Sequence, residues 1–232
     1  MSAPPRPAVL LDALGTLVTF PPPAPRLRAL LAERHGVDVD LAEAQAAMRA
    51  EIAHYRRHHG RAADAAALAE LRRECAAVLR DALPPAARDA VGVDELVPTL
   101  LDAIAFEAYP EAGEVLDALR ARGHPLAVVS NWDVSLHEVL RRTGLAERVD
   151  AVVTSAELGA AKPDPAPLRA ALRALGAPAD GARHVGDTPS EDVAAARAAG
   201  VEPVLVVRDG GPPPPGVTVI PDLRGLLDGR AP

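Results

Sequence analysis

The sequence of 232 residues is poor in cysteine, lysine and aromatic residues. Cys75 is its only cysteine, so no intrachain disulfide can form and we expect a fold stabilised by its core in a reducing cytoplasm. Five aromatic residues are too few for a base-stacking surface. The first apolar run, residues 8–11, ends at Asp12, so we expect neither a signal peptide nor a membrane span there.

The charge of the chain is mildly acidic, with a formal net value of -7 and no basic tract. Phosphate-backbone binding needs a positive surface, so we do not expect nucleic acid as a partner. Of the 25 basic residues all but one are arginine, and the single lysine is Lys162, in the proline-rich loop 159–165. Lysine in so arginine-rich a chain indicates a role that needs a compact ammonium group rather than a planar guanidinium.

Short apolar segments alternate with helical segments in the C-terminal half of the chain. The expected strands are residues 8–12, 126–130, 151–154, 184–187 and 204–207. The expected helices are residues 111–122, 134–143, 165–175 and 190–199, each ending at or near a glycine. This alternation predicts an α/β fold, a parallel Rossmann-like sheet with helices on both faces.

More than a hundred residues separate the first expected strand from the second, and their pattern is helical. Helices are expected at residues 26–35, 41–59, 63–82 and 94–107. We therefore predict an α/β core domain of residues 1–20 and 107–232, with an all-α cap domain of residues 21–106 inserted after the first strand. The proline-rich segment 210–216 is expected to form a stiff loop.

Polar residues end several of the expected strands or follow them closely. They are Asp12, Ser130, Asn131, Lys162, Asp187 and Asp192. Ligands of open parallel sheets bind at the carboxyl ends of the strands, so these groups are expected to converge on one site.

The same residues carry a family resemblance. Asp12-Ala13-Leu14-Gly15-Thr16-Leu17 resembles the first motif of the haloacid dehalogenase superfamily of aspartate-nucleophile hydrolases. Val129-Ser130-Asn131 resembles its second motif, Lys162-Pro163 its third, and the segment from Gly186 to Asp192 its fourth, all in the family's order.

The resemblance implies roles for the matching residues. Asp12 would be the catalytic nucleophile, and Thr16 would position the first loop. Ser130, beside Asn131 in the second motif, would hold a phosphoryl oxygen together with nearby backbone N–H groups. Lys162 would offset the charge of the nucleophile and of an anionic small-molecule substrate.

Three carboxylates facing one ammonium group would repel a phosphate dianion unless a cation joined them. Mg²⁺ prefers oxygen ligands, and the expected ligands are Asp12, Asp187 and the backbone carbonyl of Leu14. Asp192, the third acidic member of the metal cluster, would orient a metal-bound water or Lys162.

Leu14 departs from the family pattern, because phosphatases of this family usually carry a second aspartate there as general acid and base. A first hypothesis is a magnesium-dependent phosphatase for a small phosphorylated metabolite with a good leaving group, or one whose proton comes from the cap, where His54 and His58 share a helix face. A second is a 2-haloacid dehalogenase, whose halide leaving group needs no proton, although Leu14, Asp187 and Asp192 all depart from the pattern of that branch. A third is a catalytically impaired binding protein. The sequence does not predict an oligomeric state.

Overall fold

The computed structural model describes residues 6–208, 210 and 215–227, so most of the expected proline-rich loop lies outside the described residues. The chain divides into two compact units. One comprises residues 1–19 and 107–232 and the other residues 20–106, boundaries within one residue of the predicted domains.

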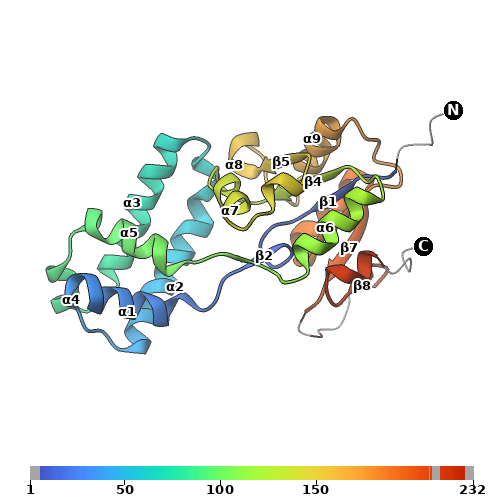
Figure 1. Cartoon of the computed structure of the whole chain (residues 1–232). Coiled ribbons are helices and arrows are strands. Elements are labelled where there is room, and N and C mark those ends of the chain that lie inside the picture. The colour runs from blue at the N-terminus through green and yellow to red at the C-terminus, as the bar shows by residue number, and fades with distance from the viewer. Residues whose placement is uncertain (1–5, 209, 211–214, 228–232) are drawn as a thin grey trace. The chain divides into compact units, whose positions relative to one another are not determined.

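The larger unit contains a six-stranded parallel sheet (Figure 1), which confirms the predicted fold class. The strands are β1 (Val9–Leu11), β4 (Leu126–Ser130), β5 (Ala151–Thr154), β6 (Arg183–Gly186), β7 (Glu202–Val206) and β8 (Thr218–Ile220). Their order across the sheet is β5-β4-β1-β6-β7-β8. The strand that precedes the first motif is thus central, between the strands that precede the second and fourth motifs.

The helices of the larger unit follow the predicted pattern, apart from the short helix directly after β5, which is not among the predicted helices. They are α6 (Ala112–Ala121), α7 (Leu136–Arg142), α8 (Ser155–Leu158), α9 (Ala166–Leu175) and α10 (Ala194–Ala199), with 3-10 turns at Ala146–Arg148 and Leu223–Leu226. The single helix predicted for residues 190–199 is wrong at its start, because Pro189–Val193 forms a π-helical turn before α10. The carboxylate of Asp192 accepts the Thr188 N–H inside this turn, at 2.9 Å. Such turns are frequent at functional sites.

Both faces of the sheet are buried, as the continuous apolar strands predict. Leu10 and Val129 belong to one core cluster with residues of α9 and α10. Leu11 and Val128, which point to the opposite face, are also fully buried. A sheet covered on both sides leaves its strand ends as the place for polar residues.

A short antiparallel ribbon stands where the chain passes between the two units. β2 (Val18–Thr19) pairs with β3 (Glu107–Ala108). The prediction that a helix runs through residue 107 is therefore wrong: the last helix of the smaller unit ends at Ala103, and Glu107 pairs with Thr19 instead. Strand pairing at this position overrode a local helical pattern.

The smaller unit is wholly helical. It contains α1 (Pro23–His35), α2 (Leu41–His58), a 3-10 turn (His59–Arg61), α3 (Ala65–Asp81), α4 (Pro85–Ala90) and α5 (Val93–Ala103). Helix α4 lies between two of the predicted helices, 63–82 and 94–107, and is not among them. Pro85 opens the helix, a position where its missing N–H costs nothing. No helix in the described ranges combines the length and apolarity needed to cross a membrane.

The paired histidines of α2 have partners inside this helical unit. His54 Nε2 lies 3.1 Å from Glu74 Oε2, which also accepts a 2.6 Å hydrogen bond from Arg61. The rings of His54 and His58 lie 4.4 Å apart. The proposed proton-donating role for these histidines remains a prediction, and His54 already takes part in a local ion-pair network.

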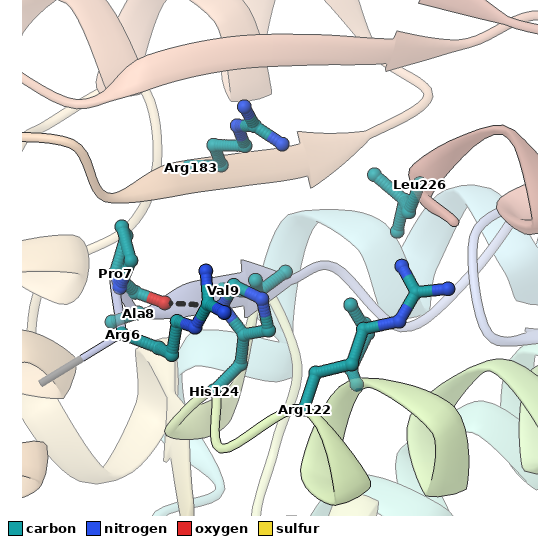
Figure 2. A pocket seen from close by; sticks show the side chains of 9 residues that line it. Arg6, Pro7, Ala8, Val9, Arg122, His124, Arg183 and Leu226 are labelled. Carbon is teal, nitrogen blue, oxygen red and sulfur yellow. Dashed lines mark hydrogen bonds between the residues drawn. The ribbon is translucent and has the colours of Figure 1, made fainter. Parts of the chain in front are cut away.

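A cavity of about 270 Å³ lies at the amino ends of the central strands (Figure 2). Arg183, the first residue of β6, donates to Glu202, and the guanidinium of Arg122 donates to the carbonyl of Leu227. His124 lies 2.8 Å from the carbonyl of Pro7. These basic groups are thus bound to groups of the larger unit, at the end of the sheet opposite the predicted site.

Glu51 is a buried carboxyl group in the helical unit. Its side chain, on α2, is 3% exposed, and its Oε2 has no hydrogen-bond partner within the described structure. Burial raises the pKa of Glu51 from 4.5 to about 7, although a hydrogen bond from the Cys75 thiol opposes the rise. The protonated form is therefore the one that the folded unit prefers.

This carboxyl group predicts a pH-dependent stability. Between pH 4.5 and about 7 the folded chain keeps a proton that the unfolded chain releases, so the free energy of unfolding should fall as the pH rises. Glu51→Gln, which stays neutral, should remove up to about 3 kcal/mol of that fall. Urea unfolding at about pH 5 and about pH 8 measures the difference. The exposed Glu33→Gln is the control, and an unchanged pH dependence in Glu51→Gln would contradict the assignment.

Candidate active site

The predicted polar residues meet at the carboxyl end of the central strands. Asp12 directly follows β1, Ser130 ends β4, and Asp187 directly follows β6. Asp192 lies in the π-helical turn after β6, and Lys162 lies in the loop before α9. The structure thus brings together side chains separated by up to 180 positions in the sequence.

Lys162 lies between two carboxylates. Its Nζ lies 2.6 Å from Asp12 Oδ1 and 2.6 Å from Asp192 Oδ1. A third hydrogen bond, 3.0 Å long, goes to the carbonyl of Val129. The side chain is 1% exposed, and its three donors have three acceptors. The only lysine in the sequence is therefore a buried, fully hydrogen-bonded cation.

The pKa values of these groups follow from burial and from their neighbours. Burial alone would lower the pKa of Lys162, but Asp12 and Asp192 outweigh it and raise the pKa. Burial raises the pKa of Asp12, and Lys162 offsets part of that rise. Asp192 resists the effect of burial, because His184 and Lys162 hold its pKa below its usual range. Lys162 and Asp192 are therefore charged at neutral pH.

Asp187 completes an acidic cluster. Carboxylate oxygens of Asp12, Asp187 and Asp192 lie within 4.8 Å of one another. The Asp187 residue reaches the surface, but part of its carboxylate is shielded from solvent. This partial burial, together with the nearby Asp192, raises the pKa of Asp187. Such a set of carboxylate oxygens suits a hard divalent cation.

Two glycines leave the space that the acidic cluster occupies. A Cβ at Gly15 would lie 2.0 Å from Asp187 Oδ2, and Gly15 has a φ of +81°. A Cβ at Gly186 would lie 2.1 Å from Asp192 Cγ. No side chain could replace either hydrogen without moving a carboxylate, so both glycines are needed for the close approach.

The second-motif residues hold Asp12 and the loop that carries Lys162. Ser130 Oγ donates to Asp12 Oδ1 at 2.9 Å. The Asn131 amide pairs with the backbone of Lys162 in both directions, accepting its N–H at 2.8 Å and donating to its carbonyl at 2.9 Å. It also donates to Glu191 at 2.8 Å. Asn131 therefore fixes the loop that carries the ammonium group.

Thr16 and Leu14 differ in their surroundings. Thr16 is fully buried, and its hydroxyl has no hydrogen-bond partner among the described residues. Leu14, by contrast, is 36% exposed. Its side chain carries no proton that could be transferred.

His184 is a site residue that the sequence did not reveal. It lies on β6, and its Nε2 is 3.0 Å from Asp192 Oδ1, while its buried Nδ1 has no partner in the described ranges. A histidine inside an apolar strand with one unpaired nitrogen costs stability. His184 is, however, a third donor to Asp192, beside Lys162 and the Thr188 N–H.

Comparison with known proteins agrees with this geometry. The family model of haloacid dehalogenase-like hydrolases matches residues 7–200, so the chain belongs to that family. Over 120 residues the chain is 42% identical to phosphoserine phosphatase from Thermus thermophilus, covering 51% of the chain and 47% of that protein. Over 103 residues it is 48% identical to phosphoglycolate phosphatase from Rhodospirillum rubrum. That match covers 44% of the chain and 42% of the phosphatase. The chain spans about half the length of these curated relatives.

Solved structures resemble the whole chain. One is a phosphatase of this family from Thermococcus onnurineus. The match includes 97% of the present chain and 99% of that phosphatase, with a TM-score of 0.66 and 25% sequence identity. Another is the 2-haloacid dehalogenase from Pseudomonas syringae. The match includes 96% of the present chain and 96% of the dehalogenase, with a TM-score of 0.67 and 25% sequence identity. Fold similarity alone therefore does not separate phosphate-ester hydrolysis from carbon–halogen hydrolysis.

The buried ion pairs predict that Lys162 resists amine-reactive reagents. Labelling needs an accessible, deprotonated amine, and Lys162 is neither accessible nor easily deprotonated. Asp192→Asn removes one of the two charges that raise its pKa, so its labelling rate should rise about tenfold or more. Peptide mass spectrometry reports this amine without interference, because the chain has no other lysine. Glu147→Gln, at an exposed carboxylate, should leave the rate unchanged, and fast labelling of the wild-type lysine would disprove the buried pair.

Proposed function

We propose that this hydrolase is a magnesium-dependent phosphatase that acts on a small phosphorylated metabolite. The observation that carries the proposal is the arrangement of Lys162 between Asp12 and Asp192, with Asp187 beside them. The arrangement offers a nucleophile, a fixed positive charge and oxygen ligands for a cation at one place.

Asp12 is the proposed nucleophile. One of its carboxylate oxygens would attack phosphorus, forming an oxygen–phosphorus bond as the bond to the leaving oxygen breaks. Water would then cleave the aspartyl phosphate and release inorganic phosphate. Ser130 and Lys162, which both donate to Asp12 Oδ1, leave Asp12 Oδ2 for the attack and fix the direction of the carboxylate.

The residues present fit a divalent cation. Asp12 and Asp187 would hold it together with the backbone carbonyl of Leu14, and Asp192 would hold Lys162 in place. When bound, Mg²⁺ would neutralise the phosphoryl oxygens and the acidic cluster. The glycine at position 15 supports this assignment, because it alone allows the first loop to approach the Asp187 carboxylate.

The substrate is expected to be small and anionic, since the net charge of -7 gives no basis for binding a polyanion. Helical residues 20–106 are proposed to act as the cap that excludes water and selects the substrate. The protein is expected to act in the cytoplasm, since its single cysteine is consistent with a reducing compartment.

Carbon–halogen hydrolysis is the alternative that a specific observation favours. Leu14 lacks a transferable proton, and a halide leaving group needs none. Release of chloride from a 2-haloacid at full rate in the presence of a chelator would establish this alternative and exclude the phosphatase.

Asp12→Asn is the test of the nucleophile. Hydrolysis of a panel of phosphate esters and acyl phosphates should fall by at least about 10³-fold, because an amide oxygen is a far weaker nucleophile than a carboxylate. A chelator should abolish the wild-type activity, and added Mg²⁺ should restore it. Lys162→Arg should also be poorly active, since the larger guanidinium does not fit a site buried on all sides. Wild-type rates in Asp12→Asn would exclude this mechanism.

Leu14→Asp tests the missing proton-transfer group. An aspartate here could protonate the leaving alcohol, so hydrolysis of alkyl phosphates should rise by about 10²–10⁴-fold. Aryl phosphates, whose leaving groups need less help, should gain much less. Leu14→Asn matches the shape of aspartate but transfers no proton, and it should show no gain. Equal wild-type rates for aryl and alkyl phosphates would show that another residue already serves as the acid.

A further inference from the structure

Arg208 follows the strand β7 and donates hydrogen bonds in three directions. Its Nη1 donates to Glu111 Oε1 at 2.7 Å, its Nη2 to the carbonyl of Thr16 at 2.9 Å, and its Nε to the carbonyl of Gly15 at 3.2 Å. The guanidinium carbon lies 3.4 Å from the centre of the Tyr109 ring. Each of the three guanidinium nitrogens therefore donates a hydrogen bond, and an aromatic ring covers one face of the group.

The acceptors belong to segments that matter for the site. Gly15 and Thr16 lie three and four residues after the proposed nucleophile, Asp12. Gly15 also packs against the Asp187 carboxylate, so a shift of this loop would disturb two members of the acidic cluster. Arg208 thus binds the backbone of the loop that connects Asp12 to β2.

The other contacts hold the root of the ribbon β2–β3. Tyr109 and Glu111 come directly after β3, and the Tyr109 N–H donates to the carbonyl of Leu17 at 3.0 Å. The chain crosses between its two units at Thr19 and Glu107, the ends of this ribbon. Arg208 therefore contacts the chain on both sides of the ribbon, before β2 and after β3.

The chemistry of these contacts requires arginine. Carbonyl and carboxylate acceptors lie on separate edges of one planar group, and an aromatic ring covers its face. Glu111 is buried, and Arg208 holds its pKa below the usual range against the effect of burial. The ammonium of lysine could serve one or two of these acceptors but not all of them. The abundance of arginine in the chain does not explain contacts of this specificity.

We propose that Arg208 is a positioning residue that holds the nucleophile loop and the ribbon in register for catalysis. This inference rests on the proposed function for its kinetic consequences. Arg208 does not touch the reacting atoms, so its loss should lower kcat and leave KM nearly unchanged. A misplaced nucleophile can cost about 10–10²-fold in rate.

The experiment compares Arg208→Gln and Arg208→Lys with the wild-type chain. We expect kcat to fall about 10–10²-fold in Arg208→Gln and less in Arg208→Lys, with KM within about threefold of the wild type. Arg224→Gln, at an exposed arginine of the same unit, should keep the wild-type kcat. A folded Arg208→Gln variant with wild-type kcat would overturn the proposal.

Chemical rescue separates positioning from a general loss of stability. In Arg208→Ala, millimolar guanidinium should restore part of kcat by occupying the vacated position, whereas ammonium should not. Absence of rescue in a folded, impaired variant would indicate a merely structural role.

Amide hydrogen exchange gives a readout that does not need activity. Exchange in peptides covering residues 13–19 and 107–112 should be faster in Arg208→Gln than in the wild type, while the β4–β5 region stays unchanged. If the wild-type chain hydrolyses no phosphate ester, the proposed function fails, yet this measurement still tests the proposal that Arg208 holds the loop and the ribbon. Unchanged exchange in both peptides would overturn it.

Discussion

The ammonium of Lys162 is held between the carboxylates of Asp12 and Asp192, and the rest of the site is arranged around this contact. Burying one carboxylate is costly, and burying two without a cation would not be tolerated. The lysine offsets that cost and leaves the cluster with a net negative charge, to which Asp187 adds. Such a charge distribution favours a divalent cation, and the proposed anionic substrate could approach only once that cation offsets the negative charge.

The surrounding residues keep this charge arrangement in place. Asn131 binds both the N–H and the carbonyl of Lys162, and His184 supplies a third donor to Asp192. Gly15 and Gly186 leave room for the carboxylates to approach. These supports lie after β1, after β4 and on β6, so the ion-pair geometry depends on the correct order of strands in the sheet.

Local patterns predicted part of this protein well. Buried strands, intervening helices and the helical insertion all follow from apolar periodicity and glycine stops, which act over a few residues. The errors lie where tertiary contacts override local preference. Glu107 is in a strand because Thr19 pairs with it, and residues 189–193 form a π-helical turn around the Asp192 carboxylate.

The sequence by itself determined the candidate groups: one lysine, the strand-ending aspartates, and a leucine where a proton-transfer group would be expected. Only the tertiary structure decided which oxygen of Asp12 is occupied, that His184 supports Asp192, and that Arg208 joins the first loop to the ribbon. The physical reason is distance along the chain. These contacts join residues far apart in sequence, and strand order and side-chain direction, rather than local periodicity, bring them within hydrogen-bonding range.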